Sequence, residues 1–187
     1  MSYVRIEEVG GKGLDRANKI LASIPGGVHK ATAAALKRAG ETAKTKAGQF
    51  AAAEYTISKG TFMGNVDVKT STSGSSGGAA SMSIIYAGSV LPLIQFNTKY
   101  SRGGRLQTQV KRNGGGGTLQ HAFVATIGAM GVFERVGTSR LPVEQKYGPS
   151  TGHMMQNEQV VEQMSKTISE TYEKRIEHEI LRLMNGW

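Results

Sequence analysis

The stretch 119–150 constrains the fold more than any other part of this chain. Polar and apolar residues alternate over 121–127 and again over 132–137, with a glycine-bounded turn at 128–131 between them. Alternation with a period of two places one set of side chains on one face of a strand, so the pattern predicts a β-hairpin. A third extended segment follows and ends at Gly148-Pro149-Ser150.

Further strand-like segments precede this hairpin. Alternation or short apolar runs predict strands near 65–69, 82–87 and 106–112. The segment 70–81 is almost entirely Ser, Thr, Gly and Ala, so we expect it to be a mobile connection. The four glycines at 114–117 are expected to be too flexible for any regular element.

The N-terminal part has a helical pattern, with helices predicted over 14–24 and 28–55. One face of the second helix is almost entirely alanine: Ala31, Ala34, Ala35, Ala39, Ala43, Ala47 and Ala51. Alanine buries little area per residue, so this helix needs a partner surface along its length. Gly40 and Gly48 are expected to weaken it by about 1 kcal/mol each relative to alanine.

A long C-terminal helix is predicted over 154–184. Its apolar stripe recurs every four residues: Val160, Met164, Ile168, Tyr172, Ile176, Ile180 and Met184. Because an interval of four exceeds 3.6, the stripe drifts around the helix, which suits packing across a sheet or a neighbouring subunit better than a two-stranded coiled coil. The stripe and the alanine face exceed what one small sheet can cover. We therefore expect Ile168, Tyr172, Ile176 and Ile180 to contribute to contacts between copies of the chain.

These patterns together predict an α+β fold, a mostly antiparallel sheet with N-terminal helices and a long C-terminal helix. The expected organisation is an α+β body over 1–150, with the Ser/Gly-rich loop at 70–81. The helix over 151–187 is either part of the same domain or an assembly arm.

Several classes of function find no support in the sequence. The chain has no cysteine, its four histidines are scattered singly, and no phosphate-binding loop or nucleophile elbow occurs. We therefore expect no catalytic, cofactor-binding or metal site and no small-molecule substrate. No run of eighteen apolar residues and no signal-peptide pattern occurs, so no membrane association is expected.

Positive charge is concentrated in the body of the chain. The net charge is +9; residues 1–150 carry 19 basic and 8 acidic side chains, whereas residues 151–187 carry 4 and 6. Five cations lie within fourteen residues that contain no acid: Lys99, Arg102, Arg105, Lys111 and Arg112. They suit contact with DNA phosphates or an acidic protein surface. Alternatively, they are solvated charges that discourage edge-to-edge strand pairing.

Several short segments, read in order, resemble the minor tail protein Z family of long-tailed bacteriophages. They are Leu91-Pro92-Leu93-Ile94-Gln95-Phe96, Ala122-Phe123-Val124-Ala125, Gly131-Val132-Phe133-Glu134-Arg135 and Tyr147-Gly148-Pro149-Ser150, and the similarity covers about residues 12 to 184. The resemblance implies a tail-completion or neck component of the virion. Such a protein would form a homo-oligomeric ring, matched to the six-fold tail, at the head-proximal end of the tail.

The resemblance also implies partners, namely a tail terminator and head–tail connector proteins, with possible non-specific contact with genomic DNA. Assembly would take place in the host cytoplasm. A different class of function stays open: a standalone, non-specific nucleic-acid-binding module that uses the basic 99–112 segment. Steeply salt-dependent DNA binding by a monomer would favour this alternative, and ring formation without DNA affinity would favour the tail protein.

Overall fold

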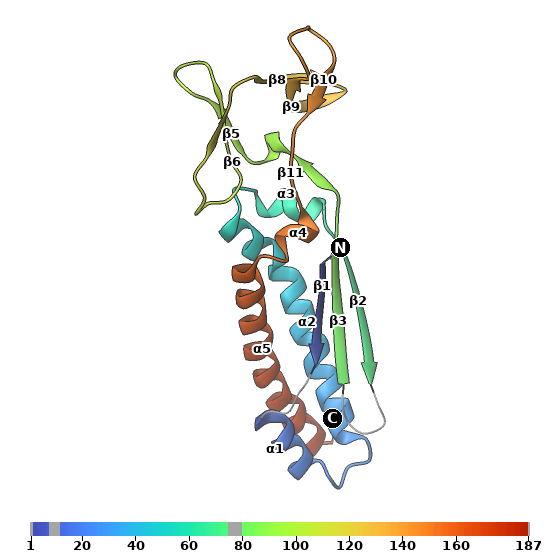
Figure 1. Cartoon of the computed structure of the whole chain (residues 1–187). Coiled ribbons are helices and arrows are strands. Elements are labelled where there is room, and N and C mark those ends of the chain that lie inside the picture. Colours follow the sequence, from blue (N-terminus) through green and yellow to red (C-terminus); the bar gives the residue numbers. More distant parts are fainter. Residues whose placement is uncertain (1, 8–11, 75–79, 187) are drawn as a thin grey trace. The chain divides into compact units, whose positions relative to one another are not determined.

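The computed structural model describes residues 2–7, 12–74 and 80–186 (Figure 1). Its helices are α1 (Lys12–Ile20), α2 (Gly27–Glu54), α3 (Lys59–Gly64), α4 (Thr151–Met154) and α5 (Glu158–Met184), with a 3-10 turn η1 (Leu93–Gln95). Its strands are β1 (Ser2–Glu7), β2 (Asp67–Gly74), β3 (Ala80–Ala87), β4 (Val90–Pro92), β5 (Asn97–Tyr100), β6 (Leu106–Gln109), β7 (Gly117–Leu119), β8 (Ala122–Ile127), β9 (Ala129–Arg135), β10 (Val143–Gln145) and β11 (Tyr147–Ser150).

The predicted α+β class is confirmed, but the prediction of a single sheet is wrong. The strands form four small sheets, ordered β1-β3-β2, β10-β9-β8, β11-β4 and β5-β6-β7. Every strand pair whose register is described is antiparallel. Most of these strands pair with a neighbour close in sequence, and η1 and tight turns separate one short sheet from the next.

The chain divides into two compact units. Unit 1 comprises 1–47, 67–86 and 161–187, and unit 2 comprises 48–66 and 87–160. Both units contain part of the segment after residue 150. The expected organisation into a body over 1–150 and a helix over 151–187 stays a prediction. Each unit is described by itself below.

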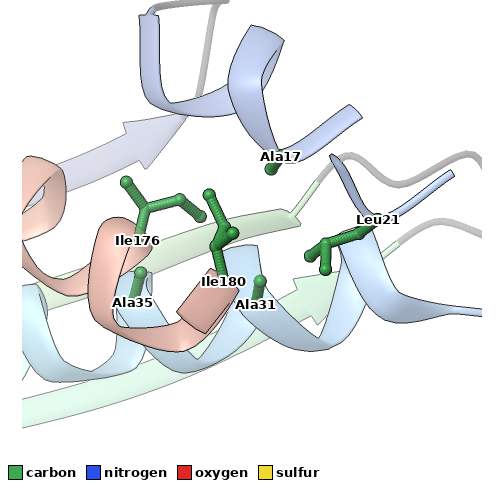
Figure 2. Close-up of a cluster of buried hydrophobic side chains, with 6 residues drawn as sticks. All are labelled: Ala17, Leu21, Ala31, Ala35, Ile176 and Ile180. Carbon is green, nitrogen blue, oxygen red and sulfur yellow. The ribbon is translucent and has the colours of Figure 1, made fainter. Parts of the chain in front are cut away.

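Helices α1, α2 and α5 build the core of unit 1. Figure 2 shows the cluster, which consists of Ala17, Leu21, Ala31, Ala35, Ile176 and Ile180. Gly40 of α2 lies close against β3, because a Cβ added at Gly40 would collide with the Met82 side chain. A side chain at this position would require the end of the Met82 side chain to shift.

This core corrects the expectation of unpartnered apolar surfaces. Ile176 is fully buried, Ile180 is 1% exposed and Ile168 is 7% exposed, and of the seven alanines named above only Ala34 is not fully buried. The premise that both surfaces lie open on a single chain is wrong, because these side chains are buried, and Ala31 and Ala35 of α2 pack with Ile176 and Ile180 of α5. It stays a prediction that another chain contacts Ile168, Tyr172, Ile176 and Ile180. The expected exposure of the apolar stripe no longer supports this prediction.

Two further differences concern strands. The predicted connection over 70–81 is shorter than expected: β2 continues to Gly74 and β3 begins at Ala80, while 75–79 lie outside the described residues. Serine and threonine form a strand here because β3 pairs with β2. Strand β1, which pairs with β3 from Ser2↔Tyr86 to Glu7↔Ser81, was not predicted. No helix in the described part of the chain has the length and apolar character needed to cross a bilayer.

Unit 2 contains the predicted hairpin. Strands β8 and β9 pair from Ala122↔Glu134 to Ile127↔Ala129, and the turn is tighter than predicted because it closes at Gly128, whose φ is 75°. Phe123 and Phe133 stand opposite each other, with ring centroids 6.4 Å apart.

The C-terminal helix begins later than predicted because two caps precede it. The Ser150 hydroxyl accepts the His153 backbone N–H at 3.1 Å and so starts the short helix α4. The Asn157 side chain then accepts the Gln159 N–H at 3.0 Å and starts α5. The segment ending at Ser150 therefore introduces helical structure.

Candidate functional site

The five cations singled out in the sequence fall into two groups within unit 2. Lys99, Arg102 and Arg105 lie on the hairpin formed by β5 and β6, and all three are exposed. Lys111 and Arg112 follow β6 and lie near the end of α2. The structure therefore does not gather all five into one patch.

Hydrogen bonds define the geometry of the β5–β6 turn. The Ser101 N–H donates to the Arg105 carbonyl at 2.8 Å, and the Gly104 N–H donates to the Ser101 carbonyl at 3.0 Å. The Arg105 N–H donates to the Ser101 hydroxyl at 3.2 Å, and Gly104 has the positive φ of 74° that such a turn requires. Arg102 and Arg105 consequently project from a closed, ordered turn.

The two faces of the β5–β6–β7 sheet differ in character. Residues two apart on a strand share a face, and Lys99 pairs with Gln107, which pairs with Thr118. This alternation defines a polar face, formed by Asn97, Lys99, Gln107, Gln109 and Thr118, of which only Gln109 is partly buried. Leu106, which is 1% exposed, lies on the opposite face, so that face packs inward.

The polar face is hollowed. An open hollow of about 300 Å³ is lined by Asn97, Lys99, Gln107, Thr108, Gln109, Gly116, Gly117 and Thr118. The Gln109 amide holds one wall in place, because it donates to the Arg112 carbonyl at 3.0 Å and to the Gly114 carbonyl at 3.1 Å. Gly117 was expected to be irregular, yet it begins β7.

The residues that line this hollow include Lys99 and no acid. No Asp or Glu occurs among the 66 residues from 68 to 133, which include all three strands of the sheet. Among the described residues, Lys99, Arg102 and Arg105 form no salt bridge. Their positive charge is therefore uncompensated by any ion pair in the described chain.

The second group of cations has a structural role and acidic neighbours. The Arg112 side chain donates through Nε to the Ala52 carbonyl at 2.7 Å, and its backbone N–H donates to the Glu54 carbonyl at 2.8 Å. These bonds satisfy carbonyls in the last turn of α2, where a cation is also favoured by the helix dipole.

Lys111 lines a second hollow, of about 410 Å³, together with Tyr55, His153, Gln156, Asn157, Glu158 and Gln159. Burial raises the pKa of the Tyr55 hydroxyl, and a hydrogen bond with Asn157 opposes this effect. The presence of Glu158 distinguishes this hollow from the acid-free one on the polar face.

Residues of the polar face other than Lys99 were missed in the sequence. Asn97 and Gln107 carry no charge, so a search for cations passes over them, although the alternation over 106–110 gave the signal for Gln107. The pairing of Gln107 with Thr118 could not be predicted, because the glycines at 114–117 show no strand pattern from which β7 could be recognised. Within the described residues, no group of three His, Asp or Glu side chains could hold a metal ion.

Comparison with known proteins gives the family. The family described as prophage minor tail protein Z (GPZ) matches residues 11–185 of the 187-residue chain. The chain belongs to this family. It is therefore a bacteriophage minor tail protein, a component of the virion, and the resemblance noted in the sequence is confirmed. No curated protein and no solved structure matches the chain.

Proposed function

We propose that this minor tail protein Z family member completes the tail of a long-tailed phage. In this proposal, copies of the chain form a six-fold ring at the head-proximal end of the tail, in the neck, and help to join head and tail. The ring contacts the tail terminator on one side and head–tail connector proteins on the other. Membership of the family over 11–185 is the observation that supports the proposal, and the protein acts by binding, without turnover.

Exposed apolar side chains of unit 2 are better candidates for contact between chains than the buried stripe of α5. Ile127 and Met130, at the tip of the β8–β9 hairpin, are 53% and 61% exposed. In the loop after β9, Val136 and Leu141 are 58% and 69% exposed. Apolar side chains that lie exposed close together are candidates for a surface that another protein covers.

The mass of the purified full chain tests the proposal, measured by light scattering alone and after mixing with the tail terminator of the same phage. We expect one closed species of six copies, or its formation on addition of the terminator. A chain that stays monomeric in both conditions would contradict the ring. Removal of the gene should leave heads and tails that do not join.

The acid-free hairpin supports a second candidate, a standalone nucleic-acid-binding module. In this case, the monomer binds DNA with steep salt dependence and no ring forms. The same mass measurement separates the two candidates, because only the first requires a closed oligomer.

A further inference from the structure

We propose that the polar face of the β5–β6–β7 sheet, together with the β5–β6 turn, binds the phosphate backbone of double-stranded DNA without reading its sequence. The site consists of Asn97, Lys99, Gln107 and Thr118 on the face and Arg102 and Arg105 at the turn. Lys111 and Arg112 do not belong to it. The proposal deepens the function proposed above. DNA binding itself does not rest on that function; only the identification of the DNA as the phage genome does.

The donors present match the chemistry of phosphate. Lys99 supplies a point charge, and the two arginines supply planar donors that bind phosphate oxygens in pairs. Amide and hydroxyl side chains next to Lys99 add neutral donors, as is common at DNA backbones. Gln107 stands directly across the strand pair from Lys99, and Thr118 stands across from Gln107, so these donors form one row beside the hollow.

The composition of the face argues against an acidic protein as its occupant. Protein interfaces are anchored by aromatic or apolar side chains, and the polar face has none. Tyr100 lies on the other face of β5, where its hydroxyl accepts the Val124 N–H at 3.0 Å. A polyanion held by charge and hydrogen bonds needs no such anchor.

The lack of aromatic side chains on the polar face also favours duplex DNA over single-stranded nucleic acid. Proteins that hold single strands stack the bases on aromatic side chains, and the polar face offers no aromatic ring. Duplex DNA presents its phosphates on the outside, with the bases already stacked. A polar face with cations at one end suits contact with this backbone.

A salt titration of the full-length chain tests the proposal. A labelled 30-base-pair duplex is the probe, with affinity measured between 50 and 200 mM KCl for two unrelated sequences. The variant Lys99→Gln/Arg102→Gln/Arg105→Gln removes three phosphate contacts, so the slope of log affinity against log salt should become shallower by about 2.7. The control Lys37→Gln/Arg38→Gln/Arg140→Gln removes one exposed lysine and two exposed arginines elsewhere and should leave the slope close to wild type.

A second pair of variants tests the face itself rather than the net charge. Gln107→Glu places a carboxylate opposite Lys99 at almost unchanged size, and it should weaken DNA binding about tenfold or more. Gln49→Glu makes the same change at an exposed position of α2 and should have little effect. Equal effects of Gln107→Glu and Gln49→Glu, or of the two triple variants, would overturn the assignment of the site.

Two further results would overturn the proposal. The first is no DNA binding by the wild-type chain at 50 mM KCl. The second is that the chain binds polyglutamate as strongly as DNA and that Lys99→Gln/Arg102→Gln/Arg105→Gln weakens both to the same degree. The second result would identify an acidic protein as the occupant. Ring formation is read separately, by mass. A chain that binds DNA but forms no ring contradicts the proposed function alone, and a ring that binds no DNA contradicts only this inference.

Discussion

Arg112 and Lys99 carry the same charge but use it differently. The Arg112 side chain donates to the Ala52 carbonyl at 2.7 Å and so closes the end of α2, whereas Lys99 forms no ion pair among the described residues. A run of cations in a sequence does not separate these roles, because the acceptor for Arg112 lies 60 residues away along the chain.

The difference predicts that replacing Arg112 lowers the Tm and that replacing Arg102 does not. Replacing Arg112 with Gln removes a charge-assisted hydrogen bond at a helix end and should cost about 1 kcal/mol, or about 2–4 °C in Tm. Arg102→Gln should leave Tm unchanged, since no such bond holds Arg102. Thermal unfolding followed by circular dichroism checks both variants. If both lower Tm equally, the structural role given to Arg112 is wrong.

Glu134 predicts a dependence of stability on pH. Its carboxylate accepts from the Lys146 ammonium at 2.6 Å, and this hydrogen bond lowers the pKa of Glu134 and raises the pKa of Lys146. A lowered folded-state pKa stabilises the fold above the ordinary Glu range, and this stabilisation is lost as pH falls through the folded pKa.

Wild type should therefore unfold at a higher temperature than Glu134→Gln at pH 6, and the difference should shrink as pH falls below the ordinary carboxyl range. At the alkaline end, the stabilisation is lost as pH rises through the raised pKa of Lys146. The measurement is Tm against pH for both proteins. A difference in Tm that does not change between pH 6 and pH 3 would show that the pair is not formed.

Helix α2 illustrates how packing overrides helix propensity. The sequence suggested that Gly40 weakens the helix, but its missing Cβ makes room for Met82, which is 1% exposed. Gly40→Ala should therefore destabilise the protein by about 1–2 kcal/mol despite the better propensity of alanine. In a Met82→Ala background the collision is absent, so the same substitution should stabilise by up to about 1 kcal/mol. Urea unfolding of the four proteins checks this reversal of sign.

At the level of elements, the sequence predicts periodic structure well and pairing poorly. The positions of α2, α5, β8 and β9 follow from apolar spacing, because each pattern is local. Alternation identifies which side chains share a face of a strand, but not which strand lies beside it. For this reason four sheets were predicted as one, and a Ser/Thr-rich strand that depends on its partner β3 was taken for part of a connection.

For the molecule as a whole, the buried position of α5 changes how assembly must be tested. Ile176→Asp would place a carboxylate in a fully buried position and should destabilise unit 1 by more than about 3 kcal/mol, so that loss of assembly would only report unfolding. Urea unfolding of this variant measures the loss. A variant that retains wild-type stability would contradict the helix packing.

The exposed tip of the β8–β9 hairpin offers a cleaner test of assembly. The variant Ile127→Asp/Met130→Asp changes two exposed side chains and should abolish ring formation while Tm stays within about 2 °C of wild type. An exposed position on another element, Gln49 of α2, gives the control, Gln49→Asp, which should assemble normally. Light scattering reports both results. Normal rings from the double variant would exclude the tip as a contact between chains.

The composition of unit 1 also has a consequence for the order of events during synthesis. Its core joins Ala17 and Ala31, which leave the ribosome early, to Ile176 and Ile180, which leave it more than a hundred residues later. Contacts so distant in sequence form late, so the part of the alanine face that packs with Ile176 and Ile180 stays open until α5 has been translated. A nascent chain thus cannot present a finished unit 1 to a growing tail, and the ribosome itself sets the earliest moment at which this subunit can join a particle.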